Sequence, residues 1–161
     1  MQNIHEYQRT MEIKKLEKNK TSEFRNLIEI FKDVFENDRQ TLDIDYLSRL
    51  LSKNDFIVFV VKVENKVVGG LTIYVLHSYY STKPIAYIYD IGITKRFQGQ
   101  GLGKALITEV CKFCKANGFE DAYVEAESDD IDAVSFYRKT KISNEMNAIH
   151  FTYAFDEEDE G

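Results

Sequence analysis

The stretch "YIYDIGITKRFQGQGLGKALI", residues 87–107, passes from a β-rich run through a glycine-rich loop directly into a helical pattern. Gly99, Gly101 and Gly103 alternate at the entrance of the expected helix, although glycine costs about 1 kcal/mol relative to alanine inside a helix. Backbone N–H groups at a helix N-terminus attract anions, and glycines let a ligand approach that backbone closely. We therefore expect an anion-binding loop here, with Lys104 adding positive charge beside it.

Two common phosphate-binding loops are excluded by the spacing. A P-loop reads G-x-x-x-x-G-K-[ST], but here Ala105 follows the Gly-Lys pair and Gln98 occupies the first glycine position. A dinucleotide fingerprint, G-x-G-x-x-G, fails when it is started at either Gly99 or Gly101. What remains is Q-x-x-G-x-G over residues 98–103. A turn that only begins a helix is the alternative, and it explains three alternating glycines poorly.

The composition bounds the class of protein. With 161 residues and a mass of 18.8 kDa, the chain suits one compact domain. We place this domain over residues 1–155, followed by an acidic, solvated or disordered tail over residues 156–161. The net charge of −6 argues against nucleic acid as a partner, because phosphate backbones need a positive footprint. It is compatible with a small cationic ligand drawn into an acidic cleft, and equally with an ordinary, mildly acidic protein.

The sequence favours a cytoplasmic protein that does not bind membranes. No apolar run is long enough to cross a bilayer, and residues 1–10 lack the apolar segment of a secretory signal. The two cysteines, Cys111 and Cys114, are too few for a disulfide framework. Because no second pair of ligands accompanies them, we interpret them as core thiols and expect no metal.

The hydrophobic patterns predict a single mixed α/β sheet in the order β-α-α-β-β-β-α-β-α-β, with room for one further short strand. Three consecutive β-rich runs joined by short turns, one of them at residues 64–66, indicate antiparallel pairing at the centre of the sheet. Thr21 or Ser22 is expected to cap the first helix, and Asn117-Gly118 to end the third. The expected strands cover residues 10–18, 56–63, 67–76, 85–94, 121–127 and 147–155, and the expected helices cover residues 21–35, 43–54, 101–117 and 129–140.

Residues 98–103 match the acyl-CoA motif [RQ]-x-x-G-x-[GA] of the GCN5-related N-acetyltransferases (GNAT family), and the predicted order of elements is similar to theirs. The resemblance implies the GNAT fold, with acetyl-CoA as the acetyl donor. It also implies that "YDIGI" is the family's central bulged strand, whose backbone at Ile91, Gly92 and Ile93 holds the pantetheine arm and polarises the thioester carbonyl. The pyrophosphate would be held by the loop, at Gln98, Gly99, Gln100, Gly101, Leu102, Gly103 and Lys104.

Asp90 and Tyr137 are the candidate catalytic residues. Asp90, beside the thioester position, is a candidate to bind the cationic amine and to accept its proton, directly or through water. The resemblance places Tyr137, in "AVSFYRK", at the position of the usual general acid. With a reference pKa of about 10 against about 8.5 for a thiol, tyrosine protonates a thiolate uphill by roughly 2 kcal/mol, which is feasible. The structural alternatives are a buried, hydrogen-bonded carboxylate for Asp90 and a core aromatic ring for Tyr137.

A closer resemblance is to the small aminoglycoside 3-N-acetyltransferases, on the segments "YIYDIGI", "DDIDAVSFY" and "IHF". It implies a polycationic acceptor in contact with acidic side chains, for which the candidates are Asp90, Asp129, Asp130 and Glu36. Capping of the following helix is an alternative role for Asp129 and Asp130, and a solvated turn is the alternative for Glu36. After Tyr137, Lys-Thr-Lys-Ile replaces the K-L-G-I of that group, so the glycine that ends the helix is missing.

Together these features predict an acetyl-CoA-dependent N-acetyltransferase that acts by direct attack of a primary amine on the thioester. The expected acceptor is a small cationic amine such as an aminoglycoside. An acetyltransferase of a protein or peptide amine, or of a polyamine, is the first alternative. A non-catalytic CoA-binding module is the alternative of another class. A homodimer is compatible with the resemblance, and no metal, membrane or nucleic-acid partner is expected.

Overall fold

The computed structural model describes residues 10–155, so the predicted acidic tail lies outside the described residues. By its internal contacts the chain divides into two compact units, with the division between Ala126 and Glu127. Within the described residues, the first unit holds a sheet and three α-helices, and the second holds one α-helix. A single domain over residues 1–155 stays a prediction.

The first unit is built on a five-stranded mixed sheet in the order β1-β2-β3-β4-β5. The pairs β1/β2, β2/β3 and β3/β4 are antiparallel, and β5 runs parallel to β4. The predicted mixed α/β class and its antiparallel centre are therefore confirmed for the described part of the chain. The strands are β1 (Met11–Lys15), β2 (Phe56–Val63), β3 (Lys66–Leu76), β4 (Ile85–Ile93) and β5 (Asp121–Val124).

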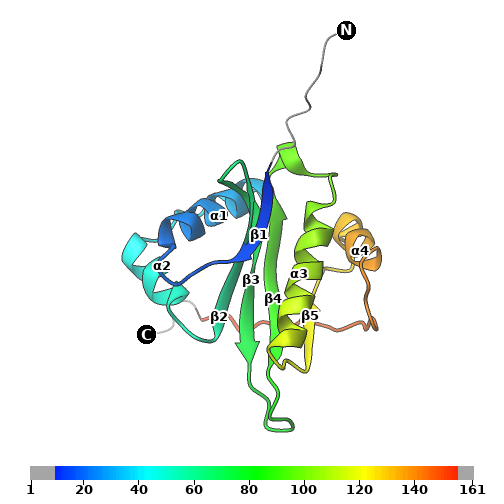
Figure 1. Ribbon diagram of the computed structural model, residues 1–161. Helices are drawn as coiled ribbons and strands as arrows, with labels where there is room; N and C mark the ends of the chain where they lie inside the picture. The colour runs from blue at the N-terminus through cyan, green and yellow to red at the C-terminus, as the bar shows by residue number, and fades with distance from the viewer. Residues whose placement is uncertain (1–9, 156–161) are drawn as a thin grey trace, which may run out of the picture. The chain divides into compact units, whose positions relative to one another are not determined.

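Helices cover both faces of this sheet, as Figure 1 shows. On one face, called the α1/α2 face, lie α1 (Thr21–Val34) and α2 (Ile44–Leu51). On the other, the α3 face, lies α3 (Leu102–Ala116). A short 3-10 helix, η1 (Lys95–Phe97), joins β4 to α3. Because β2 is covered from both sides, all eight of its residues are buried, which explains the continuous apolar run over residues 56–61.

Two apolar clusters fix the helices to the sheet. Leu27 and Phe31 of α1 are buried in the cluster on the α1/α2 face, and Leu106 of α3 is buried in the cluster on the α3 face. Full burial of such a side chain stabilises the fold by about 1.5–3 kcal/mol. Cys114 also lies in the α3 cluster, as predicted, but Cys111 is exposed. The interpretation as a core thiol is therefore wrong for Cys111, which lies off the buried stripe of α3.

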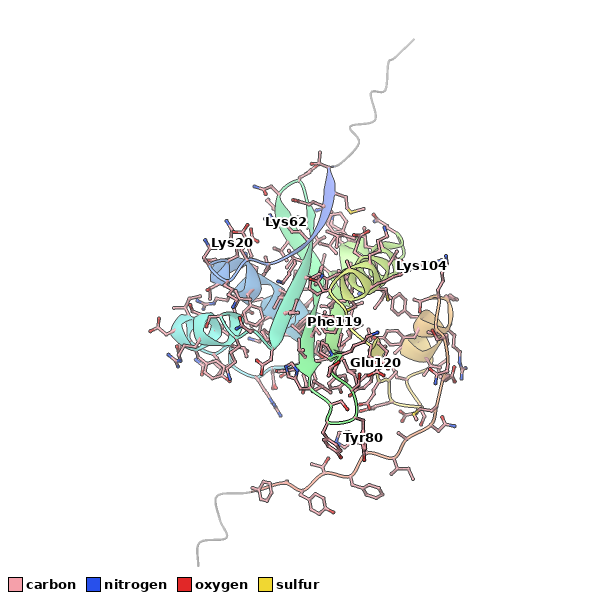
Figure 2. All side chains as sticks on the ribbon, turned by 60° about the horizontal axis from the view of Figure 1, so that its bottom comes forward. Lys20, Lys62, Tyr80, Lys104, Phe119 and Glu120 are labelled. Atoms are coloured by element: carbon pink, nitrogen blue, oxygen red, sulfur yellow. The ribbon has the colours of Figure 1, made fainter. Side chains whose placement is uncertain are left out.

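The first turn of α1 differs from the prediction. Neither Thr21 nor Ser22 caps the helix, because both already lie inside it, and Lys20 at the N-cap position makes no side-chain cap. The nearby acid, Glu23, instead pairs with Lys62 of β2, whose side chain is buried beneath the helix. Figure 2 labels Lys20 and Lys62 in this region.

Helices α1 and α3 end in the same way. In α3, Gly118 adopts a left-handed φ of 73° and the Phe119 N–H donates to the Cys114 C=O at 3.0 Å, which confirms the predicted helix end. In α1, Glu36 occupies the position equivalent to Gly118, with a φ of 52°. A non-glycine residue in this conformation is uncommon and carries a steric cost.

The second unit contains α4 (Ile131–Arg138). Asp130 begins the helix, since its Oδ1 accepts the Ala133 N–H at 3.0 Å. Arg138, the last residue of the helix, donates from Nε to Oε2 of Glu145 at 3.0 Å.

The strand predicted over residues 147–155 is wrong, because the structure has no strand there. Polar and apolar side chains do alternate in this segment. Alternation, however, only assigns side chains to two faces, and a strand also needs ladder hydrogen bonds from a partner. The segment forms no such ladder.

Candidate active site

β4 carries a β-bulge at Tyr89. In the ladder with β3, Thr72 is opposite Asp90. The next β3 residue, Ile73, is opposite Ile88, so Tyr89 has no partner in β3. A bulge shifts the alternation of side chains by one residue. Tyr89 and Asp90 consequently both lie on the α1/α2 face, where they line one pocket, and the bulge that the resemblance implied is confirmed.

Beyond the bulge, alternation resumes in the shifted register. Ile91 and Ile93 pack with the cluster on the α3 face. Gly92 faces α1, and a Cβ atom built there would come within 3.0 Å of Phe31 Cδ1. Without the bulge, Asp90 would face the apolar cluster beneath α3, where an unpaired carboxylate is strongly disfavoured. The bulge is therefore what makes Asp90 available to a ligand.

A cavity of about 210 Å³ opens beside Asp90. Its walls are largely aromatic: Phe31 stacks on Phe35 with 5.6 Å between ring centroids, and Tyr74 meets Tyr89 edge to face at 5.3 Å. Asp90 is the one carboxylate among the described residues that line the cavity. An aromatic pocket with a single acid suits a cationic group carried on a ring or an aliphatic stem.

The electrostatics of the pocket favour Asp90 as a base. The carboxyl is half-buried, and burial raises its pKa above the usual value because the charged form loses contact with water. A raised pKa makes the carboxylate a stronger proton acceptor. Lys32 also lines the pocket, but its charge is paired with groups other than Asp90. Its Nζ donates to Thr41 Oγ1 at 3.0 Å and lies 3.6 Å from Glu29 Oε2.

The edge of β4 that follows Ile88 is open on the side of β5. The parallel ladder joins Ile85–Ile88 to Asp121–Val124 and goes no further. Residues 89–93 thus have no β5 partner in the described sheet, and their outward backbone groups can pair with an extended ligand. This open edge contains the predicted cofactor residues Ile91, Gly92 and Ile93.

The glycine loop is fastened to the end of this strand. Gln98 Nε2 donates to the Ile93 C=O at 2.8 Å, so the Gln98 side chain holds the loop in place. Gly99 and Gly101 have φ values of 73° and 80°, and a Cβ atom on either would meet nothing within 4 Å. Glycine is therefore needed at both positions for the backbone conformation itself. The space above them remains open to a ligand.

Helix α3 begins without a side-chain cap at Gly101. The N–H groups of its first turn, from Leu102 to Lys104, have no partner inside the helix by virtue of their position, and they form an anion site with the positive end of the helix dipole. Lys104 is labelled in Figure 2, and Gln100 is exposed in the loop before the helix.

A wider hollow of about 500 Å³ lies between β1 and the start of α3 and shares no lining residue with the pocket at Asp90.

Three predicted site residues belong to the second unit, so their place in the site stays a prediction. Tyr137 is half-buried on α4, with 5.1 Å between its ring centroid and that of Phe136. Asp130 caps α4 through its side chain, and the backbone C=O of Asp129 accepts the Ile131 N–H at 3.0 Å. The helix-capping alternative is thereby confirmed for Asp130.

Sequence reasoning missed most of the pocket. Glu36, a predicted acceptor residue, is exposed and does not line the cavity, whereas its neighbour Asn37 does. Phe31 and Phe35 lie at helical spacing, but Phe31 is buried whereas Phe35 is 46% exposed. One feature of the sequence could have indicated this pocket residue. The apolar stripe of α1 continues to Phe35 at the very end of the helix, beyond Phe31, which is its last buried residue.

Comparison with known proteins identifies the family. A model of the acetyltransferase (GNAT) family matches residues 24–141, and the chain belongs to this family. An aminoglycoside acetyltransferase from an uncultured soil metagenomic sample, solved in complex with sisomicin, is 44% identical, with a TM-score of 0.89 over 91% of this chain and 97% of that one. A second aminoglycoside acetyltransferase from such a sample is 22% identical, with a TM-score of 0.80 over 90% of this chain and 99% of that one, which supports the fold alone.

Curated relatives match over a shorter segment. The mycothiol acetyltransferase of Arthrobacter sp. (strain FB24) is 36% identical over 55 residues, which are 34% of this chain and 17% of that protein. The chain thus spans less than a fifth of the length of the curated relatives it matches. None of the helices in the described part of the chain has the length and apolar character needed to cross a membrane.

Proposed function

We propose that this protein is an acetyl-CoA-dependent N-acetyltransferase whose acceptor is a small amine with several positive charges, of the aminoglycoside class. The observation that carries the proposal is the half-buried carboxylate of Asp90 in an aromatic pocket, next to the open edge of β4. The relative solved with sisomicin supports this acceptor class, since its 44% identity extends over 97% of its chain.

Two features of the first unit fit acetyl-CoA. The open edge at residues 91–93 offers backbone groups to the amide-bearing pantetheine arm, and the uncapped start of α3 with Lys104 offers N–H groups and charge to the diphosphate. Acetyl-CoA, when bound, supplies a thioester: the amine nitrogen forms a C–N bond to its carbonyl carbon, the C–S bond breaks, and the sulfur leaves as a thiol.

Asp90 prepares the amine for this attack. An ammonium group has no lone pair, so it must lose one proton before attack and a second one as the amide forms. The Asp90 carboxylate binds the ammonium and accepts its proton, directly or through a water molecule. Burial assists, because it raises the pKa of Asp90 toward that of the amine.

Other groups stabilise the charge that develops elsewhere. Backbone N–H groups at residues 91–93 donate to the carbonyl oxygen as it becomes negative. The Tyr137 hydroxyl protonates the departing sulfur, at a cost of roughly 2 kcal/mol from the reference pKa values.

Thiol release from acetyl-CoA tests the proposal directly. The purified protein is assayed with sisomicin, spermidine and a lysine-containing peptide, beside the variants Asp90→Asn and Tyr137→Phe. We expect turnover with sisomicin, and a roughly 10²- to 10⁴-fold lower kcat in each variant, the range for loss of a general acid or base. Asp55→Asn and Tyr80→Phe are matched controls, since both residues are exposed and neither lines the pocket; Figure 2 shows Tyr80 on the loop between β3 and β4.

Three outcomes would contradict the proposal in different ways. Turnover of only the peptide or of spermidine would change the acceptor class. Tight binding of acetyl-CoA without turnover of any amine would favour a non-catalytic CoA-binding module. Unchanged kcat in Asp90→Asn would remove Asp90 from the chemistry.

A further inference from the structure

Four tyrosines form a continuous row across β3, β4 and β5. Tyr74 contacts Tyr89 edge to face at 5.3 Å, and Tyr89 contacts Tyr87 in the same way at 6.0 Å. Tyr87 in turn stacks on Tyr123 of β5, with 4.7 Å between centroids and 12° between ring planes. Tyr74, Tyr87 and Tyr123 are also neighbours in the strand ladders, so this tyrosine row lies on one face of the sheet. Because Tyr74 and Tyr89 line the pocket at Asp90, the row begins in that pocket and leads outward to β5.

A second carboxylate lies at the far end of the tyrosine row. Tyr87 Oη donates to Glu125 Oε2 at 3.2 Å, and Glu125 is exposed. Glu125 directly follows Val124, the last residue of β5, and its hydrogen bond to Tyr87 places its carboxylate beside the tyrosine row. A carboxylate has about four acceptor positions, so the hydrogen bond from Tyr87 orients Glu125 and leaves it able to accept from a ligand.

The size of the pocket explains why such an extension is needed. Its volume of about 210 Å³ is below the roughly 300–1,000 Å³ that is typical of sites for drug-sized ligands. An acceptor with several rings can therefore place only the reacting ring beside Asp90. The rest of it must lie outside the pocket, where Tyr89 and Tyr123 are 56% and 38% exposed and present aromatic surface to sugar rings and ammonium groups.

We infer that Glu125 and the tyrosine row form a second acceptor subsite, which binds a further ammonium group of a polycationic amine while Asp90 holds the reacting one. The inference rests on the proposed function and goes beyond it, because it names what sets the preference among amines. Acceptors with two or more ammonium groups gain from Glu125, and acceptors with one do not.

Steady-state kinetics with Glu125→Gln test this subsite. Sisomicin serves as the acceptor with several ammonium groups and glucosamine as the acceptor with one. For sisomicin we expect KM to rise roughly threefold to tenfold with kcat unchanged, the range for one partly exposed charge-assisted hydrogen bond, and for glucosamine no change. The sisomicin difference should shrink at high salt, because salt screens exposed charges. Glu12→Gln is the matched control: it removes the same charge from β1, at the opposite edge of the same sheet.

The outcomes separate this inference from the proposed function. If the unmodified protein acetylates sisomicin but Glu125→Gln and Glu12→Gln behave alike, the subsite is refuted and the proposed function stands. An equal rise of KM for both acceptors would likewise refute it, since Glu125 would then act through the structure of the pocket. If the unmodified protein neither acetylates nor binds sisomicin in calorimetry with CoA present, the acceptor class and the subsite fall together.

Discussion

Glu36, which follows the C-cap residue of α1, is expected to cost stability rather than to bind the acceptor. Its N–H donates to the Asp33 C=O at 3.4 Å, and the Asn37 N–H donates to the Lys32 C=O at 2.9 Å. Helix α3 closes with the same pair of bonds around Gly118, so the chain itself shows which residue this position prefers. The perturbation is Glu36→Gly.

The magnitude follows from the backbone conformation. A left-handed φ such as the 52° of Glu36 costs an L-residue roughly 1–2 kcal/mol. Glycine removes this cost but loses about 0.5–1 kcal/mol through its greater freedom in the unfolded chain. The net gain in the free energy of unfolding is about 0.5–1 kcal/mol, which corresponds to roughly 1–4 °C in Tm for a chain of this size.

Guanidinium unfolding of the unmodified protein, Glu36→Gly and Glu36→Gln checks this number. Glu36→Gln keeps the strained backbone and removes the charge, so it should unfold at nearly the same midpoint as the unmodified protein. Glu36→Gly should unfold at a higher midpoint with an unchanged m value. Equal midpoints for the two variants would refute the conformational argument. A raised acceptor KM in both would instead show that Glu36 binds the acceptor through its charge, as the sequence predicted.

Three further variants probe other parts of the fold. Burial raises the pKa of Asp90 above 3.8 in the folded state, so between the unfolded-state and folded-state pKa values the folded protein binds more protons, and stability falls as pH rises through that window. Asp90→Asn should therefore have a higher Tm than the unmodified protein at neutral pH. In a series of Tm measurements against pH, this difference should vanish below about pH 3.8. Gly101→Ala forces alanine into a φ of 80°, and it should lower stability by about 1 kcal/mol and raise KM for acetyl-CoA but not for the acceptor. Lys62→Met leaves the largely buried Glu23 without its partner and should cost about 3 kcal/mol in urea unfolding, most of it recovered when Glu23→Leu is added.

The order of elements is predictable because it depends on neighbouring residues. The hairpin between β2 and β3 is an example: apolar runs flank a polar turn, and the structure places Glu64 and Asn65 there with φ values of 50° and 66°. Such a two-residue turn matches the twist of the paired strands. The ends of α3 and the antiparallel centre of the sheet follow from similarly local signals.

The face on which Asp90 lies is not predictable from its own neighbourhood. Strict alternation in "YIYD" assigns Asp90 to the same face as Ile88, which is the apolar α3 face. The position of the bulge depends on how β3 aligns with β4, and this alignment joins residues that are distant in the sequence. Only the family resemblance anticipated the bulge, and no pattern in the sequence announced the tyrosine row that it helps to form.

The bulge at Tyr89 also bears on how such a site can arise in a gene. A substitution changes the side chain at one position but preserves the alternation of the strand. It can therefore place a carboxylate only on the face to which that position already points. The gain of one codon shifts every later residue of β4 to the opposite face at once. In this chain the shift brings Asp90 to the pocket, turns Gly92 toward Phe31 of α1 and returns Ile91 and Ile93 to the core. A three-nucleotide insertion can therefore accomplish together what four separate substitutions would have to accomplish one by one.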